Sequence, residues 1–370
     1  MKKYIKPDFT NSNLNITSSL AKFLNAPNDK PTIKILDDEL NKNYEKIVFI
    51  CYDGLGNHPI NVNLDKNSIL RKNIKKTLTS TFPSTTTNAT TSLLTNKYPL
   101  EHGWFGWSLY FSEYGRNVDI FPKRDSATGE PLKFDKFPLD KGKYYFDLSN
   151  TDYEINTVFP PYVIVDYQER NHVFNDNQGF FDNIASILKK KGKQFIYAYL
   201  GEPDTTMHEF GVTSKESKEL INYINDETEK LVKSSKNTLF IITADHGQVD
   251  IEGYVDFVGD EKLMNMLMIY PYLDARAPAF KVKEGMHKEF EEYFKEKYSD
   301  DFILYKSEDL IKDNYFGPMG KYAYLLGDYI GVGTFTHKTA KMTPNSHEFK
   351  GHHTSLTEEM EVPLIMVTNK

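Results

Sequence analysis

A threonine-rich stretch is the first segment whose residue types could carry out chemistry. Pro83 and the small polar residues after it predict a turn, and residues 88–95 can follow as a helix, so the central threonines lie near a helix N-terminus. Free backbone N–H groups at such an end favour an anion such as phosphate. A polar turn with an ordinary N-cap explains the segment equally well when it is taken alone.

Aspartate and histidine residues in two further segments have the donor atoms and spacing of metal ligands. Asp204 and His208 are four residues apart, so one helical turn would place both on one face, which suits a shared metal ion. Asp245 and His246 follow an apolar run, where burying a carboxylate beside an imidazole is costly unless a metal ion or hydrogen bonds compensate. A surface pair and a hydrogen-bonded structural pair are the respective alternatives.

Residues from the two ends of the chain complete this set. Asp53 follows another apolar run, and His352 and His353 lie beside the terminal one. Oxygen and nitrogen donors of this kind match the ligand preference of zinc, with manganese as an alternative. The single cysteine, Cys51, excludes an internal disulfide and a cysteine-rich zinc module.

The segments that must position these side chains read as buried strands separated by helices. Apolar runs at 46–52, 194–200 and 239–244 each lead to a carboxylate, and a fourth at 362–367 reads as a last strand. Helical spacing appears in residues 11–24, 180–191 and 216–234. We therefore predict an α/β fold with a doubly wound, mostly parallel central sheet and helices on both faces, whose ligands lie beyond the carboxyl ends of the strands.

The 370 residues favour a single domain that carries insertions. Two stretches, about 110–165 and about 264–333, fit the alternation of strands and helices poorly, apart from a helix expected at 284–298. We expect both insertions to form a rim or cap around the site.

Charge and composition limit the classes of partner that the protein is expected to bind. A net charge of −7 argues against a nucleic-acid polymer, although a local metal charge still permits a small anionic substrate. The N-terminus has lysines but no apolar stretch behind them, and no run approaches eighteen apolar residues. We expect a cytoplasmic protein that does not associate with a membrane.

The joint order of these motifs resembles the alkaline phosphatase superfamily, most closely its nucleotide pyrophosphatase and type I phosphodiesterase branch. The resemblance spans roughly residues 47–367. It rests on Tyr52-Asp53-Gly54, the Phe82-Pro83-Ser84-Thr85-Thr86 stretch leading to Tyr98-Pro99-Leu100-Glu101-His102-Gly103, Glu202-Pro203-Asp204 followed by His208, Ala244-Asp245-His246-Gly247, and Gly351-His352-His353 followed by Leu356-Thr357-Glu358-Glu359.

The resemblance implies two zinc ions, with manganese possible. One zinc would be held by Asp204, His208 and His353, and the other by Asp53, Asp245 and His246. The family's glycine-x-histidine spacing selects His353, and the adjacent His352 is its rival.

The resemblance also implies a nucleophile that contacts the second metal ion. Counting back from Thr95 and His102, which correspond to landmarks of the family, selects Thr86. Thr81 ranks second and Thr85 is also near. His102 also recurs in the resemblance, but its place in a loop before a helix or turn favours a structural hydrogen bond over a catalytic role.

The activity that the resemblance implies is hydrolysis of phosphodiester or pyrophosphate bonds through a phosphothreonine intermediate. Its substrate would be a small phosphoester, possibly a nucleotide. A phosphomonoesterase or a phosphonate hydrolase of the same superfamily is an alternative, because these enzymes share the metal ligands. From another class, a catalytically silent small-anion binding protein is a further alternative.

Substrate contacts depart from the family at one position. An asparagine of the family that binds a phosphoryl oxygen is replaced by Trp107, and Asn88 could substitute for it from the helix start. Trp107 belongs to an aromatic segment, residues 104–111, which could stack a nucleobase or pack as an ordinary buried cluster. Asn88 and Trp107 are therefore candidate substrate-binding residues, although capping of the helix start is the favoured use of the Asn88 side chain.

Overall fold

A six-stranded sheet forms the centre of the computed structural model, which describes residues 3–163, 168–318 and 320–369. Its strands are β1 (Lys46–Tyr52), β2 (Ile74–Thr79), β6 (Glu154–Val158), β7 (Gln194–Leu200), β8 (Thr238–Thr243) and β17 (Glu361–Asn369). They lie in the order β2-β17-β8-β1-β7-β6, and β1 pairs in parallel with β7 and β8. The predicted last strand, β17, is antiparallel to both of its neighbours, so the sheet is mostly parallel.

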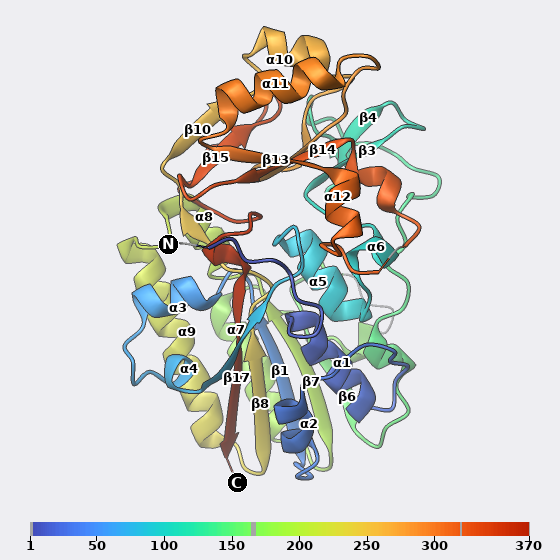
Figure 1. Ribbon diagram of the computed structural model, residues 1–370. Coiled ribbons are helices and arrows are strands. Elements are labelled where there is room, and N and C mark those ends of the chain that lie inside the picture. The colour runs from blue at the N-terminus through green and yellow to red at the C-terminus, as the bar shows by residue number, and fades with distance from the viewer. Residues whose placement is uncertain (1–2, 164–167, 319, 370) are drawn as a thin grey trace.

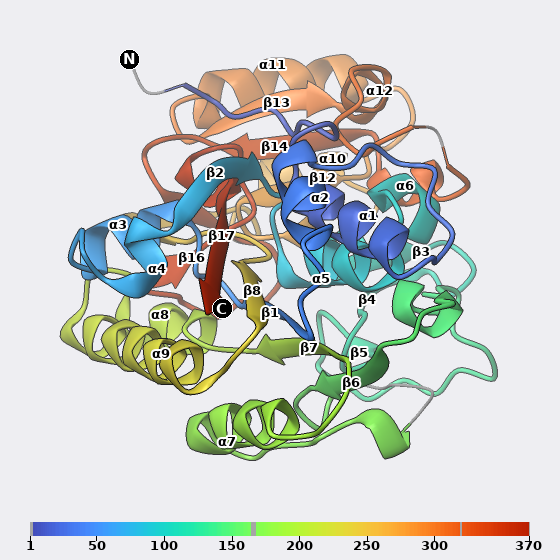
Figure 2. The ribbon, with the colours of Figure 1, turned by 90° about the horizontal axis from the view of Figure 1, so that it is seen from below.

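Helices cover both faces of this sheet, as expected for strands whose residues are buried on both sides. Within the described part of residues 3–234, the α-helices are α1 (Asn13–Phe23), α2 (Lys34–Leu40), α3 (Asn57–Asn63), α4 (Ile69–Lys72), α5 (Thr86–Thr95), α6 (Pro99–His102), α7 (Asn177–Leu188), α8 (Asp204–Phe210) and α9 (Lys215–Ser234). Figure 2 shows α1 and α2 on one side of the sheet and α7 and α9 on the other. The predicted doubly wound α/β fold is confirmed.

The long helix α9 shows why such segments become helical. The Ser214 side chain caps its first turn by accepting a hydrogen bond from the N–H of Ser217. Ile221, Ile224 and Thr228 recur at intervals of three and four residues and are buried. Lys218, Glu219 and Lys230 of the same helix are exposed to water. Burial of this stripe against the sheet therefore fixes the helix and its orientation.

The two predicted insertions meet in a second, seven-stranded sheet (Figure 1, upper half). Its strands are β3 (Ser108–Phe111), β4 (Arg116–Asp119), β5 (Arg124–Asp125), β11 (Tyr272–Asp274), β12 (Ala277–Phe280), β13 (Phe302–Lys306) and β14 (Tyr329–Gly333). Their order is β13-β14-β12-β11-β3-β4-β5, and the neighbours pair antiparallel. The pairing of Leu273 with Ser108 joins the two insertions.

Short elements complete the described parts of the chain. The remaining helices are α10 (Glu261–Met266), α11 (His287–Tyr298) and α12 (Ser307–Lys312), with 3-10 helices η1 (Tyr145–Leu148), η2 (Gln168–Arg170), η3 (Ala323–Leu326) and η4 (Glu358–Met360). Two small sheets pair β10 (Gly253–Asp256) with β15 (Lys338–Lys341), and β9 (Val249–Asp250) with β16 (Gly351–His352). No helix of these described parts is both long and apolar enough to span a membrane.

The first insertion is shorter than predicted. Residues 154–158 form β6, the edge strand of the central sheet, and pair in parallel with residues 194–198 of β7. The strand follows a long irregular segment and has polar residues at Glu154, Asn156 and Thr157, which hid it from an apolar-run search. Residues 164 and 165, at the predicted end of this insertion, lie outside the described residues.

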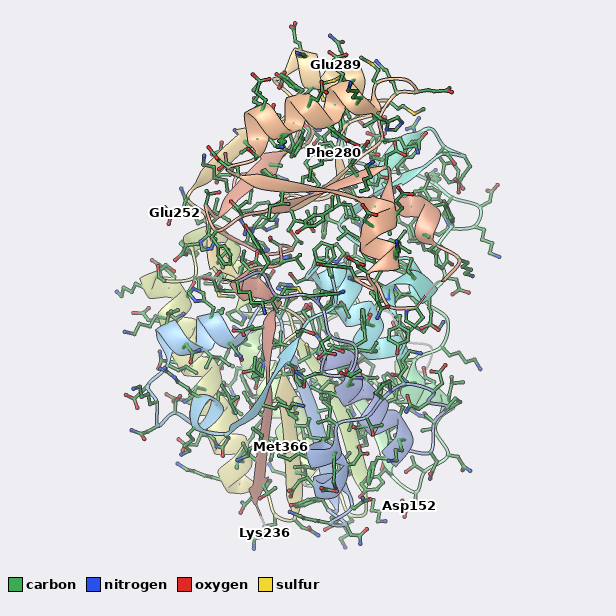
Figure 3. All side chains as sticks on the ribbon, viewed as in Figure 1. Asp152, Lys236, Glu252, Phe280, Glu289 and Met366 are labelled. Atoms are coloured by element: carbon green, nitrogen blue, oxygen red, sulfur yellow. The ribbon has the colours of Figure 1, made fainter. Side chains whose placement is uncertain are left out.

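Separate clusters of buried hydrophobic side chains pack against the two large sheets. Met366 belongs to the cluster around the central sheet, whereas Phe280 packs with Phe257, Phe290 and Phe294 under α11 (Figure 3). The carboxyl ends of β1, β7 and β8 point toward the second sheet. The rigid central sheet therefore presents its strand ends to residues that the insertions bring.

Candidate metal centre and active site

Three strand exits deliver buried carboxylates to one place. Asp53 directly follows β1, Asp245 follows β8 after one residue, and Asp204 begins α8 just beyond β7. Their exposed fractions are 4%, 0% and 9%, respectively. Uncompensated carboxylates so deeply buried are costly, so this position demands a positive partner.

One group of facing side chains consists of Asp53, Asp245 and His246, the predicted ligands of the second metal ion. One donor atom from each lies within 4.8 Å of the others. Nε2 of His246 lies 3.3 Å from Oδ1 of Asp53 and 3.4 Å from Oδ2 of Asp245. The N–H groups of Gly54 and His246 both donate to Oδ1 of Asp245, which leaves its other oxygen toward the imidazole.

The other group consists of Asp204, His208 and His353, the predicted ligands of the first metal ion. The four-residue spacing on α8 brings Nε2 of His208 to 3.3 Å from Oδ2 of Asp204. Nε2 of His353 lies 3.7 Å from Oδ1 of the same carboxylate. The rings of His246 and His353 have their centroids 3.8 Å apart, so the two groups adjoin.

The pairing of β9 with β16 explains how distant histidines reach the strand exits. His352 pairs with Val249, a few residues beyond the end of β8, and His353 follows directly. A nitrogen of His352 also lies within 4.8 Å of donor atoms of His208 and His353. The structure thus brings both neighbouring histidines to the centre.

Backbone carbonyls fix the tautomers of the three predicted histidine ligands. Nδ1 of His208 bonds to the carbonyl of Gly351 at 2.8 Å, that of His246 to Gly247 at 2.9 Å, and that of His353 to Ser84 at 3.1 Å. Because a carbonyl only accepts, each Nδ1 carries the proton in the neutral ring and each Nε2 presents a lone pair. These lone pairs face carboxylate oxygens, an arrangement that a shared cation would stabilise.

Buried carboxylate oxygens without a hydrogen-bond partner in the described parts of the chain also indicate that a cation would bind here. Among the described residues, Oδ1 of Asp204 and Oδ2 of Asp245 are buried without a hydrogen-bond partner. Two groups, each offering carboxylate oxygen and imidazole nitrogen, suit divalent ions such as Zn²⁺ or Mn²⁺. The residues present therefore fit the predicted pair of metal ions.

Burial and mutual repulsion perturb the acids. Burial, followed by the charges of Asp245 and Asp204, raises the pKa of Asp53 well above its usual value. Burial is also the main cause that raises the pKa of Asp245 to about 7. Burial alone would raise the pKa of Asp204, but the neighbouring imidazoles, with His208 contributing most, together outweigh it and lower that pKa. Burial and three neighbouring imidazoles hold the pKa of His353 well below its usual value.

Thr86 is the first residue of α5, and its hydroxyl reaches the group of candidate ligands that contains Asp53 and His246. Oγ1 lies 3.2 Å from Nε2 of His246 and 3.4 Å from Oδ1 of Asp53. Thr85 precedes it as an extended N-cap residue, which turns the chain into the helix. The first backbone N–H groups of α5 therefore face the same region as the Thr86 hydroxyl.

The two rival threonines have other surroundings. Thr81 is fully buried, and its hydroxyl has no partner among the described residues. Thr85 donates its hydroxyl to Oδ2 of Asp274 at 3.0 Å. Of the three, Thr86 is the one whose hydroxyl contacts the predicted ligands of the second metal ion.

A cavity of about 750 Å³ opens in front of this centre. Thr86, Asp204 and His208 line this cavity together with Trp107 and with Arg124 of the first insertion. Trp107 is 43% exposed, so its ring is available to a ligand and is not part of a buried cluster.

Asn88 does not reach the cavity, in contrast to the sequence-based prediction. Its side chain is fully buried, and its amide donates to the carbonyl of Pro83 at 2.9 Å. On the helix the residue two positions beyond Thr86 turns away from the strand exits. His102, expected to be structural, bonds to the Ser92 hydroxyl and accepts from the N–H of Trp104, each at 3.0 Å.

Three further residues escaped the sequence analysis. Tyr199 in β7 donates its hydroxyl to Oδ2 of Asp53. Asp274 at the end of β11 contacts Nε2 of His352 at 3.0 Å. Arg124 donates from Nε to Asp119 at 2.8 Å and lines the cavity. A tyrosine inside an apolar strand and charges inside an irregular insertion carry no motif, so only the fold reveals them.

Solved structures with a similar fold include those of two kinds of enzyme. Murine ectonucleotide pyrophosphatase / phosphodiesterase 5 superposes with a TM-score of 0.62 at 15% identity, covering 88% of each chain. The human protein of the same name gives 0.62 at 17% identity, over 87% of this chain and 88% of the other. Phosphonoacetate hydrolase from Sinorhizobium meliloti 1021, in complex with phosphonoformate, gives 0.61 at 17% identity, over 87% and 90%.

Most of the sequence matches a known protein family. No curated protein matches the chain. Residues 63–355 match the family described as type I phosphodiesterase / nucleotide pyrophosphatase, and this stretch includes six of the seven residues predicted to form the metal and nucleophile site. The chain belongs to the type I phosphodiesterase / nucleotide pyrophosphatase family of the alkaline phosphatase superfamily.

Proposed function

We propose that this protein is a metal-dependent hydrolase of phosphodiester or pyrophosphate bonds in which Thr86 is the nucleophile. The observation that carries the proposal is the position of the Thr86 hydroxyl, within 3.4 Å of both Asp53 and His246, beside the cavity that Thr86 lines. Family membership supports the hydrolase class.

Two groups of side chains would hold the ions. Asp204, His208 and His353 are proposed for one Zn²⁺, and Asp53, Asp245 and His246 for the other, with Mn²⁺ as the alternative metal. Bound there, the pair of ions would supply positive charge that favours the threonine alkoxide, the pentacoordinate phosphorus and the leaving oxygen.

Residues of the protein itself supply the nucleophile and orient the groups around it. Oγ1 of Thr86 forms a bond to phosphorus while the bond from phosphorus to the leaving oxygen breaks, which gives a phosphothreonine intermediate that water then hydrolyses. Free N–H groups in the first turn of α5 are placed to bind a phosphoryl oxygen during both steps. The carbonyl contacts of the three histidines keep their Nε2 atoms aimed at the centre.

The wall of the cavity favours an ester with a large leaving group. Trp107 offers an exposed aromatic face to a nucleobase or another planar group. Arg124 keeps Nε on Asp119, and Ser126 holds the other oxygen of that carboxylate at 2.6 Å. The guanidinium is thereby fixed in the wall, where it can attract a second anionic group of the substrate.

Related structures are consistent with small phosphoester ligands. One is an inactive variant of murine ectonucleotide pyrophosphatase / phosphodiesterase 5, with a threonine-to-alanine substitution, in complex with AMP. A second candidate function is phosphonate hydrolysis, because phosphonoacetate hydrolase in complex with phosphonoacetate superposes equally well, with a TM-score of 0.62.

Side-by-side assays test the proposal. Metal-free protein and protein reconstituted with Zn²⁺ or Mn²⁺ are offered bis-p-nitrophenyl phosphate, p-nitrophenyl phosphate and phosphonoacetate. The proposal expects metal-dependent cleavage of the diester above that of the monoester. Faster monoester cleavage, or release of phosphate from phosphonoacetate, would replace it with one of the alternatives. Inactivity toward all three with either metal would contradict it.

A further inference from the structure

His352 is placed like a metal ligand although the family resemblance leaves it out. It is 5% exposed, and one of its nitrogens lies within 4.8 Å of donor atoms of both His208 and His353. Its ring centroid is 5.1 Å from that of His208 and 4.7 Å from that of His353. The side chain therefore adjoins the group proposed for the first metal ion.

Asp274 determines which nitrogen of His352 carries the proton. Its Oδ1 contacts Nε2 of His352 at 3.0 Å, and the N–H of Ala275 donates to the same oxygen at 2.8 Å. The other oxygen accepts the Thr85 hydroxyl at 3.0 Å. A carboxylate that receives these donors is held in its acceptor form, so Nε2 of His352 is the protonated nitrogen and Nδ1 presents a lone pair.

The orientation of the ring is fixed from its face as well. Phe349 stacks on the imidazole with ring centroids 4.6 Å apart and planes 3° from parallel. Among the described residues, Nδ1 has no hydrogen-bond partner although it is buried. A buried lone pair without a partner is costly, whereas a metal ion would satisfy it.

We propose that His352 is an additional ligand, through Nδ1, of the metal ion held by Asp204, His208 and His353. This rests on the metal dependence in the proposed function. The first position then has three imidazoles and one carboxylate, whereas the second has two carboxylates and one imidazole. Since zinc prefers imidazole more strongly than manganese does, His352 makes the first position selective for Zn²⁺. A catalytic zinc ion can take a fifth ligand, so one substrate oxygen still has room.

Metal affinity measured without substrate tests the assignment. His352→Ala and the volume-conserving Asp274→Asn are titrated with Zn²⁺ and Mn²⁺ in competition with a chelator, beside wild type. His347→Ala is the matched control, because His347 is an exposed histidine in the wall of the same cavity. We expect the binding of one of the two Zn²⁺ ions to weaken by about 10- to 100-fold in both variants, with a smaller change for Mn²⁺ and no change in the control.

Cobalt spectra give a second readout. The visible absorption of Co²⁺-substituted protein should change in His352→Ala, because the number of nitrogen ligands falls, and should not change in the control. Folded variants that keep wild-type Zn²⁺ affinity and the wild-type Co²⁺ spectrum would overturn the proposal. If His352→Ala does not fold, the Asp274→Asn variant alone tests whether His352 is a ligand, because it leaves the imidazole in place. Wild-type protein that binds two Zn²⁺ ions but hydrolyses no ester would instead refute the proposed function alone.

Discussion

The hydroxyl of Thr86 lies 3.2 Å from Nε2 of His246. The contact joins the first residue of α5 to the exit of β8, two segments that are 160 residues apart in the chain. Because Nδ1 of His246 is held by the carbonyl of Gly247, the nitrogen that faces Thr86 is the one with the free lone pair. The backbone therefore fixes the proposed nucleophile, Thr86, relative to the proposed metal ligand, His246.

Threonine-to-valine substitutions separate the three candidate nucleophiles at nearly constant volume. Thr86→Val should lower kcat for the diester by at least about 10³-fold, because the attacking oxygen is lost. Thr81→Val should keep kcat within about twofold and keep stability, because it removes a buried hydroxyl without a partner. Steady-state kinetics and thermal unfolding check both. A large loss of kcat in Thr81→Val with Thr86→Val still active would refute the assignment.

Tyr199 is expected to position Asp53, since its buried hydroxyl donates to Oδ2 of that carboxylate. Tyr199→Phe should weaken binding of one metal ion by about 10- to 100-fold, as losses of outer hydrogen bonds to metal ligands do. Tyr52→Phe is the control, because it removes a buried hydroxyl that bonds to Thr228 at 2.7 Å. Unchanged metal affinity in Tyr199→Phe would show that Asp53 needs no such support.

A buried ion pair anchors the loop that carries His353. Nε of Arg276 lies 2.8 Å from Oε1 of Glu359, both side chains are fully buried, and Ser355 N–H donates to the same carboxylate. Glu359→Gln leaves the Arg276 charge unpaired, so the free energy of unfolding should fall by about 3 to 5 kcal/mol. Denaturant titration measures it, with exposed Asp38→Asn as the control, expected to cost less than about 1 kcal/mol. Equal effects in the two variants would contradict the anchoring role.

Acid should weaken the packing of α10 against α11 through Asp260. Burial would raise the pKa of this carboxyl, but hydrogen bonds, the largest from Lys297, outweigh it and lower the pKa to about 2. The unfolded pKa is about 4, so the folded state binds fewer protons than the unfolded state, and this stabilisation, present above pH 4, is lost as the pH falls toward 2. Wild type should exceed Asp260→Asn in stability by about 2 kcal/mol near pH 6, and the difference should shrink toward pH 2. A difference independent of pH would exclude this cause.

The sequence predicted those parts of the site that lie at strand ends. Asp53, Asp204 and Asp245 follow uninterrupted apolar runs, and parallel strands bring their carboxyl ends to one edge, so their meeting could be expected. The family resemblance supplied the choice of Thr86 and His353. Both choices remain predictions until ligand and nucleophile are tested directly.

Residues that depend on tertiary pairing could not be predicted. Asp274 comes to the site because β11 pairs with β3 across the two insertions. Asn88 was misplaced because a two-residue step along a helix turns a side chain to another face, which a count from Thr86 does not reveal. The strand β6 was missed because it is short, partly polar and at the sheet edge.

Identifying the covalent intermediate tests the central claim most directly. Zinc-loaded protein is mixed with bis-p-nitrophenyl phosphate, quenched in acid during turnover, digested and analysed by mass spectrometry, with Thr86→Ala treated in parallel. If Thr86 is the nucleophile, a phosphoryl or aryl-phosphoryl adduct forms on the peptide that contains residues 80–95 and fragmentation locates it on Thr86, with no adduct in the variant. An adduct on Thr81 or Thr85, or turnover with the adduct absent and activity retained in Thr86→Ala, would contradict it.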